Sequence, residues 1–164
     1  MADHGFFMGD RGFAGKWSHY EESLRVPLII YDPRLPPRNR GVVANHMALN
    51  IDVSATMLEL AGLERPAHYE GRSLLPLLQG KDVKDWRRDF FCEHSVQHPR
   101  IPKWEGVRGE RFVYARYFDQ QPVFEFLHDL QTDPDQLANL ASHPDYQEEL
   151  VRLRDRCAEF AKRE

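Results

Sequence analysis

The sequence is poor in cysteine and has no long apolar run. Its two cysteines, Cys92 and Cys157, lie far apart along the chain and match no metal-binding or redox spacing. We expect both to be small buried apolar side chains rather than the two halves of a disulfide. No apolar run approaches the roughly 20 residues that a membrane-spanning helix needs, and the first residues lack a charged start followed by an apolar stretch. The sequence therefore predicts a soluble chain without a membrane partner, and it shows no export signal.

The sequence also lacks an excess of positive charge. The 22 Lys and Arg residues against 26 Asp and Glu give a formal net charge of −4 and a pI near 6.1. Proteins that bind nucleic acids usually gather Lys and Arg on one face, so the composition argues against a nucleic-acid partner. With 164 residues, 41% hydrophobic and 29% charged, the chain is long enough for a proper core. Any anion that it binds is expected to be met by a few local side chains.

The first half of the chain predicts an α/β architecture. Residues 24–31 form a nearly continuous apolar run with β-branched side chains, which is typical of a strand buried on both faces, and Pro27 should precede the strand proper. Asp52 is a good N-cap for a helix that ends before Gly62. One face of that helix would carry its apolar residues: Val53, Met57 and Leu60. Residues 73–80 predict a short helical turn.

From about residue 85 the pattern becomes that of paired antiparallel strands. Four segments fit such strands: 89–93, 106–108, 111–118 and 123–130. A helix then opens at residues 142–145 and carries an amphipathic stripe: Tyr146, Leu150, Leu153, Cys157 and Phe160. We expect this helix to cover one face of the small sheet. The overall prediction is an α/β fold, α+β in its C-terminal part, divided into residues 1–84 and a smaller subdomain of residues 85–164.

Several residues near the N-terminus have the chemistry of an ion-binding site. Asp3 is a hard oxygen ligand of the kind that Ca²⁺ or Mg²⁺ prefers, and His4 is able to coordinate a metal or donate a hydrogen bond to an oxyanion. Lys16 could neutralise an anion, and His19 carries an imidazole that titrates near neutrality. Taken alone these residues equally fit a turn pair, a solvated lysine and a packed loop histidine.

The order of these residues resembles the C-terminal part of the sulfatase family, within the alkaline-phosphatase-like superfamily. The matching positions are Asp3-His4-Gly5, Gly9, Gly12, Lys16, Tyr20-Glu21, Arg25 and Val26-Pro27-Leu28-Ile29-Ile30. Further matches follow along the chain: Asn50-Ile51-Asp52-Val53, Gly71-Arg72-Ser73-Leu74, Glu105-Gly106-Val107-Arg108, Asp133-Pro134 and Asn139-Leu140-Ala141. The resemblance covers nearly the whole chain and implies the tail of a mixed sulfatase-type sheet followed by a small antiparallel sheet under a C-terminal helix.

The resemblance implies roles for particular residues. Asp3 and His4 would be ligands of a divalent cation, usually Ca²⁺, and Asp3 would also help to activate the nucleophile. Lys16 would hold the sulfate oxygens and stabilise charge on the leaving oxygen, so Lys16 and Asp3 are the expected catalytic residues. Further contacts with a sulfated small molecule or sulfated carbohydrate are expected from four more side chains: His19, His94, His98 and Lys103.

One departure from the family pattern limits these expectations. The family's nucleophile is a formylglycine made from Cys or Ser in a Cys/Ser-x-Pro/Ala-x-Arg motif, and neither Cys92 nor Cys157 stands in that motif. The family's N-terminal Asp-Asp pair, which supplies further metal carboxylates, also has no counterpart. We therefore expect this chain to be the C-terminal portion of a sulfatase whose formylglycine half lies elsewhere, and to have no turnover by itself. Location stays open between the periplasm and secretion for the parent enzyme.

Two other functions remain open from the sequence. The chain could belong to a phosphonate or phosphate monoester hydrolase of the same superfamily, because these enzymes share the metal, aspartate and histidine chemistry. It could instead be a non-catalytic interaction module. In that case exposed sheet surface at residues 26–31 would allow self-association.

Overall fold

The computed structural model describes residues 2–162. The chain forms two units, one made of Met1–Pro27 with Arg88–Glu164 and the other of Leu28–Arg87. The expected boundary near residue 84 lies close to the second junction, whereas the first 27 residues pack with the C-terminal unit. The division into residues 1–84 and 85–164 stays a prediction about domain organisation. No helix within residues 2–162 is long and apolar enough to cross a membrane.

A four-stranded antiparallel sheet is the centre of the first unit. Its strands follow one another in chain order: β3 (Asp89–His94), β4 (Trp104–Gly109), β5 (Phe112–Tyr117) and β6 (Phe124–Asp129). The register places Phe91 opposite Val107, Val107 opposite Tyr114, and Tyr114 opposite Leu127. These residues form one row across one face of the sheet, because residues that pair directly across neighbouring strands point to the same side. The predicted antiparallel strands are confirmed.

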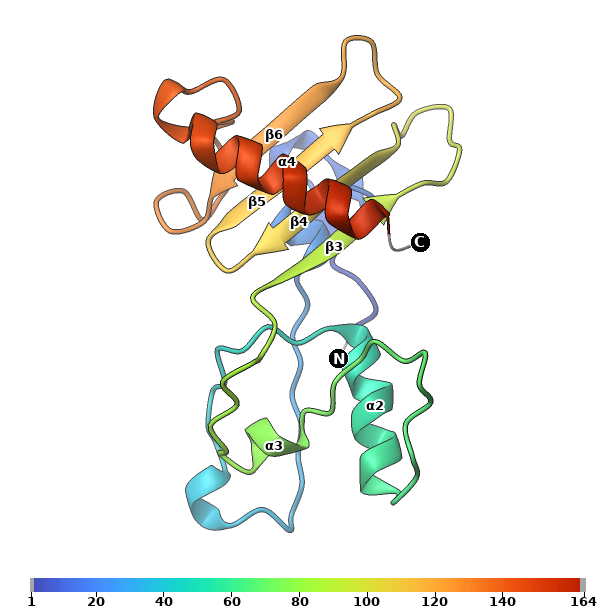
Figure 1. Cartoon of the computed structure of the whole chain (residues 1–164), viewed down its shortest axis with the longest axis vertical. Coiled ribbons are helices and arrows are strands. Elements are labelled where there is room, and N and C mark those ends of the chain that lie inside the picture. Colours follow the sequence, from blue (N-terminus) through green and yellow to red (C-terminus); the bar gives the residue numbers. More distant parts are fainter. Residues whose placement is uncertain (1, 163–164) are drawn as a thin grey trace. The chain divides into compact units, whose positions relative to one another are not determined.

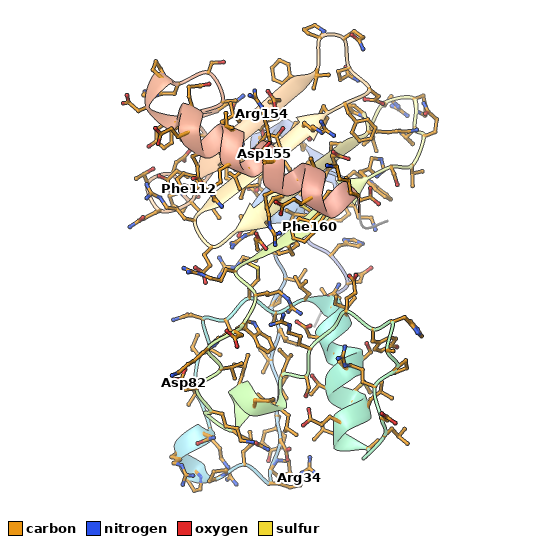
Figure 2. All side chains as sticks on the ribbon, in the orientation of Figure 1. Arg34, Asp82, Phe112, Arg154, Asp155 and Phe160 are labelled. Atoms are coloured by element: carbon orange, nitrogen blue, oxygen red, sulfur yellow. The ribbon has the colours of Figure 1, made fainter. Side chains whose placement is uncertain are left out.

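Helix α4 (Gln147–Ala161) covers that face of the sheet. Its Leu150, Leu153 and Cys157 are fully buried in one cluster with Val107, Tyr114 and Leu127, as the stripe of alternating spacings predicts. Figure 1 shows α4 lying across the strands, and Figure 2 labels Phe160 near the end of this helix. The ring of Phe160 packs on that of Phe91, with ring centroids 5.9 Å apart. Each fully buried apolar side chain of this size stabilises the fold by about 1.5–3 kcal/mol.

The other face of the sheet is covered by the N-terminal segment, which appears behind the strands in Figure 1. This segment contains a small hairpin, β1 (Phe7–Met8) with β2 (Ala14–Gly15), and the short helix α1 (Glu21–Leu24). Trp104 donates its indole N–H to the carbonyl of Trp17 (2.7 Å), and Arg108 forms a bidentate ion pair with Glu21. Nothing in the sequence pattern indicated a cover for the second face of the sheet.

The second unit contains α2 (Asn50–Leu60) and α3 (Leu75–Leu78). Single 3₁₀ turns lie at Pro37–Asn39 in this unit and at Asp10–Gly12 and Pro144–Tyr146 in the first. The predicted turn at residues 73–80 is confirmed by α3. Gly62 has a φ of 69° just after α2, so the predicted end of that helix is confirmed as well.

The predicted N-cap and buried face of α2 are wrong. Leu49 is the N-cap, and Asp52, at the third helical position, accepts the Leu49 N–H at 2.7 Å. Met57 and Leu60 are exposed, whereas the buried residues are Asp52, Ala55 and Thr56. Polar contacts with the segment after the helix decide the face. They run from the backbone N–H of Arg72 to Asp52 and from that of Leu74 to Thr56.

The predicted strand at residues 24–31 is also absent. α1 ends at Leu24, and residues 25–31 are irregular, with Ile29 86% and Tyr31 84% exposed. A strand needs a neighbour for its backbone groups, and this segment pairs with none of the described residues. The fold class is nevertheless confirmed as mixed α/β, built from a two-stranded sheet, a four-stranded antiparallel sheet and helices.

Candidate functional site

The hairpin of the N-terminal segment brings Asp3, His4 and Lys16 together. Phe7 pairs with Gly15, so the residues before β1 lie beside the residues after β2. The ammonium of Lys16 is in close contact with Nε2 of His4, and Oδ2 of Asp3 lies 3.2 Å from the same nitrogen. The structure thus assembles the three residues that the sequence singled out.

Gly5 fixes the position of this cluster. Its N–H donates to the carbonyl of Ser23 at 2.9 Å, and a Cβ at this position would lie 2.0 Å from the carbonyl oxygen of Glu22. Only glycine allows the backbone to approach α1 so closely. Asp3 and His4 are therefore held against a short helix that is itself anchored on the sheet by Glu21 and Arg108.

The contacts of His4 show how its two ring nitrogens are used. Nδ1 lies 2.7 Å from the carbonyl of Gly5, which only accepts, so Nδ1 donates this hydrogen bond and Nε2 faces the other two residues. Nε2 is in close contact with the Lys16 ammonium and lies 3.2 Å from Oδ2 of Asp3, so the three side chains meet at this nitrogen. A carboxylate and an imidazole side by side are ligand types that divalent cations take, and the ammonium beside them suits an anion.

The donor set fits part of a metal shell. Ca²⁺ takes about 6–8 oxygen ligands, whereas Asp3 and His4 supply one carboxylate and one imidazole. Within residues 2–162 there is no group of three or more His, Cys, Asp or Glu side chains placed to hold a metal ion. A metal bound here would need most of its ligands from outside this cluster.

His94 lies close to the cluster through Trp17. The ammonium of Lys16 lies 4.8 Å from the centre of the Trp17 ring, whose centroid is 5.2 Å from that of His94. Burial, and next the nearby His98, lower the pKa of His94, so this imidazole is neutral at pH 7. Trp17 is therefore in contact with both His94 and Lys16, the predicted sulfate-binding residue.

His98 and Lys103 lie on the connection between β3 and β4. His98 is exposed and accepts the backbone N–H of Arg100 at Nδ1 (3.2 Å), and it forms an isolated bridge with Ile101. The backbone of Lys103 donates to Asp119 at 3.0 Å. These contacts hold the loop, and among residues 2–162 no hydrogen bond or ion pair joins the side chain of His98 or Lys103 to the Lys16 cluster.

His19 lies apart from the other candidates, in the interior between the N-terminal segment and the sheet. It is 1% exposed, and its Nδ1 and Nε2 contact the hydroxyl of Tyr117 (3.0 Å) and Nε2 of His128 (3.2 Å). Burial is the main reason why its pKa lies well below the usual value. The ring is thus held in the interior by Tyr117 and His128, and a role for His19 in substrate binding stays a prediction.

Sequence reasoning missed Trp17 and His128, which contact the predicted residues. A signal for His128 was present, since it shares the period-2 pattern of β6 with Phe126, and both rings face His19. Trp17 follows Lys16 directly, but nothing local to the sequence showed that its ring would lie between Lys16 and His94.

Comparison with protein families finds a match over residues 9–163 to the family described as N-sulphoglucosamine sulphohydrolase, C-terminal. Among curated proteins, the chain is similar to an N-acetylglucosamine-6-O-sulfatase of Bacteroides thetaiotaomicron, with 32% identity over 160 residues. That match covers 93% of this chain and 28% of the relative. The chain thus spans about a third or less of the length of such relatives.

Two solved structures show the same fold. One, in complex with its substrate D-glucosamine-2-N,6-O-disulfate, matches with a TM-score of 0.82 and 27% identity, over 97% of this chain and 32% of that one. The other is a phosphonate monoester hydrolase from Silicibacter pomeroyi, with a TM-score of 0.84 and 30% identity, over 99% of this chain and 34% of that one. Both likenesses extend over nearly the whole of the present chain.

Proposed function

Because the chain belongs to the family of C-terminal domains of N-sulphoglucosamine sulphohydrolase, we propose that it supplies part of the sulfate-ester site of a longer hydrolase. The observation that carries the proposal is that the Asp3 carboxylate and the Lys16 ammonium both lie against Nε2 of His4. The chain spans 28% of one curated sulfatase, so the activity of the whole protein remains a proposal.

Each residue has a distinct role in the proposal. Lys16 binds the sulfate oxygens and offsets the negative charge that grows on the leaving oxygen, an effect worth several kcal/mol in a preorganised site. Asp3 and His4 contribute two ligands to a divalent cation, for which Ca²⁺ is the first candidate, and Asp3 helps to activate the nucleophile. When bound, such a cation polarises the sulfuryl group as a Lewis acid. The formylglycine nucleophile would be supplied by the remainder of the parent protein.

A sulfated carbohydrate is the proposed substrate class. The relative named above is an N-acetylglucosamine-6-O-sulfatase, and a structural neighbour holds a sulfated glucosamine. Of the other predicted substrate residues, His94 packs on Trp17, whose ring lies beside the Lys16 ammonium. His98 and Lys103 remain proposals for the outer part of a substrate.

A phosphonate monoester hydrolase is the second candidate, because one such enzyme has the same fold over 99% of this chain. A tetrahedral phosphonate oxyanion would suit Lys16 as well as a sulfate does. The ratio of kcat/KM for a sulfate ester to that for a phosphonate monoester, measured with both substrates competing for the parent enzyme, would distinguish the two activities.

The first test uses the purified chain, Ca²⁺ and 4-nitrophenyl sulfate. We expect no turnover above the buffer rate, and metal-dependent hydrolysis by the chain alone would refute the division of the site between two halves. A second measurement follows sulfate binding by NMR. Sulfate should shift the signals of His4 and Lys16 in a saturable way, Lys16→Ala should abolish the shift, and Lys81→Ala, an exposed lysine elsewhere, should not. A shift unchanged in Lys16→Ala would contradict the proposed role.

A further inference from the structure

Trp17 is held in a backbone conformation that its side chain disfavours. Its φ is 92°, in the region that favours glycine, and a bulky residue there costs on the order of 1–3 kcal/mol. The fold keeps it there through both backbone groups. The N–H of Trp17 donates to the hydroxyl of Ser23 at 3.2 Å, and its carbonyl accepts the indole N–H of the buried Trp104 at 2.7 Å.

The strain places an indole ring at the surface. Trp17 is 43% exposed, whereas Trp104 is buried and Trp86 is half-buried. Large aromatic side chains normally gain stability by burial, so an exposed ring on a strained backbone contributes little to the core. Its recorded ring neighbours are the Lys16 ammonium and the His94 imidazole, with 56° between the planes of the two rings.

His94 brings a second unfavourable feature to the same place. The residue is 7% exposed, and its Nε2 has no hydrogen-bond partner among the described residues. A buried polar atom without a partner costs about 1–3 kcal/mol. Its ring packs on Trp17, and the charged groups that act on it are His98 and Asp119. Strain and an unused hydrogen-bonding atom therefore occur together, next to the predicted sulfate ligand.

We propose that Trp17 and His94 form the subsite for the sugar ring of a sulfated pyranose whose sulfate is bound by Lys16. The indole face suits the C–H face of a pyranose, the unpartnered Nε2 suits a ring hydroxyl, and the adjacent ammonium suits the anionic end. This inference rests on the function proposed above, and it adds how the site would distinguish a sugar sulfate from a sulfate without a ring.

The test compares four ligands by NMR titration of the purified chain: D-glucosamine 6-sulfate, D-glucosamine, methyl sulfate and 4-nitrophenyl sulfate. The sugar sulfate should bind about tenfold or more tightly than methyl sulfate. It should also bind more tightly than the aryl sulfate, which offers a ring face but no hydroxyl. Equal binding of the sugar sulfate and methyl sulfate would overturn the subsite.

Two variants separate a binding role from a structural one. Trp17→Gly removes the ring and suits the φ of 92°, and His94→Phe keeps a ring against Trp17 while removing the unpartnered nitrogen. Both should unfold at the same or a higher urea concentration than the parent chain, yet bind the sugar sulfate no more tightly than methyl sulfate. Unchanged sugar binding in Trp17→Gly would overturn the inference, and so would a joint loss of stability and binding in both variants.

Lys16→Ala distinguishes a failure of the sugar subsite from a failure of the proposed sulfate-ester function. If this variant loses methyl sulfate binding while the wild-type chain shows no preference for the sugar, Lys16 keeps its proposed role and the subsite is refuted. If Lys16→Ala binds methyl sulfate as the wild type does, the proposed function itself fails. A wild-type chain that binds none of the sulfated ligands refutes both.

Discussion

The imidazoles of His19 and His128 meet through their Nε2 atoms, 3.2 Å apart, in the interior of the protein. His128 donates from Nδ1 to the carbonyl of Ala138 at 2.9 Å, so its Nε2 accepts. His19 then donates from Nε2 and accepts the Tyr117 hydroxyl at Nδ1. This single order of protons requires both rings to be neutral.

The stability of the chain should therefore fall in mild acid. Burial is the largest cause that lowers the pKa of both imidazoles. Arg11 also lowers both values, His128 further lowers that of His19, and Ala138 and Asp133 partly offset the shift in His128. Because the folded pKa lies below the unfolded value of about 6.5, the stabilisation is present above that pH and is lost as the pH falls. Urea unfolding between pH 8 and 5 should show a loss of up to ~1.4 kcal/mol per pH unit for each imidazole.

The double variant His19→Phe/His128→Phe tests this origin of the pH dependence. It should be less stable at pH 8, because Tyr117 and Ala138 lose partners, but its stability should change less with pH. Some slope should remain, since the pKa of His94 is also lowered. His68→Gln, at an exposed histidine, should keep the full slope. Equal slopes in the wild type and the double variant would show that the pair does not set the acid sensitivity.

Asp52→Asn should strongly destabilise the unit of residues 28–87. The carboxylate is fully buried and accepts hydrogen bonds from the backbone N–H groups of Leu49 and Arg72 and from the two terminal nitrogens, Nη1 and Nη2, of Arg87. Removing its charge leaves Arg87 poorly paired, and breaking such a buried pair costs about 3–5 kcal/mol. The matched control is Glu110→Gln, which breaks the exposed pair with Arg88 and should change urea unfolding little. Similar losses in both variants would contradict the importance of burial.

Gly5→Ala should separate His4 from Lys16. The added methyl group would lie 2.0 Å from the Glu22 carbonyl, so the segment must move away from α1. We expect sulfate binding to weaken at least several-fold. In Gly5→Ala, a further Lys16→Ala change should no longer shift the NMR signals of the His4 ring. Gly12→Ala is the control, since its φ of 74° is strained but no atom lies within 4 Å of the new methyl group. Intact sulfate binding in Gly5→Ala would mean that the close approach does not position the site.

Leu150→Ala and Val151→Ala should differ sharply although the residues are neighbours on α4. Leu150 is fully buried in the cluster under the helix, and its truncation should cost about 2–5 kcal/mol in urea unfolding. Val151 is 51% exposed and should cost well under 1 kcal/mol. Comparable losses would show that α4 does not pack on the sheet in the register described here.

Part of the candidate site was readable from the sequence because it is local. Asp3, His4 and Lys16 are linked by one short hairpin, so their proximity needs no contact with distant segments. The ring of Trp17 could not be placed in the same way. Its surroundings depend on Trp104 and His94, which are distant in the sequence and reach it only when the sheet has formed.

The sequence by itself determined the strands of the small sheet and the buried stripe of α4, because hydrophobic periodicity follows directly from helix and strand geometry. Only the tertiary structure decided which face of α2 is buried, how the second face of the sheet is covered, and that residues 25–31 lie exposed. Those outcomes depend on partners far along the chain. Asp52 is buried because Arg87 meets it, and an apolar run becomes a strand only where a neighbouring backbone accepts its hydrogen bonds.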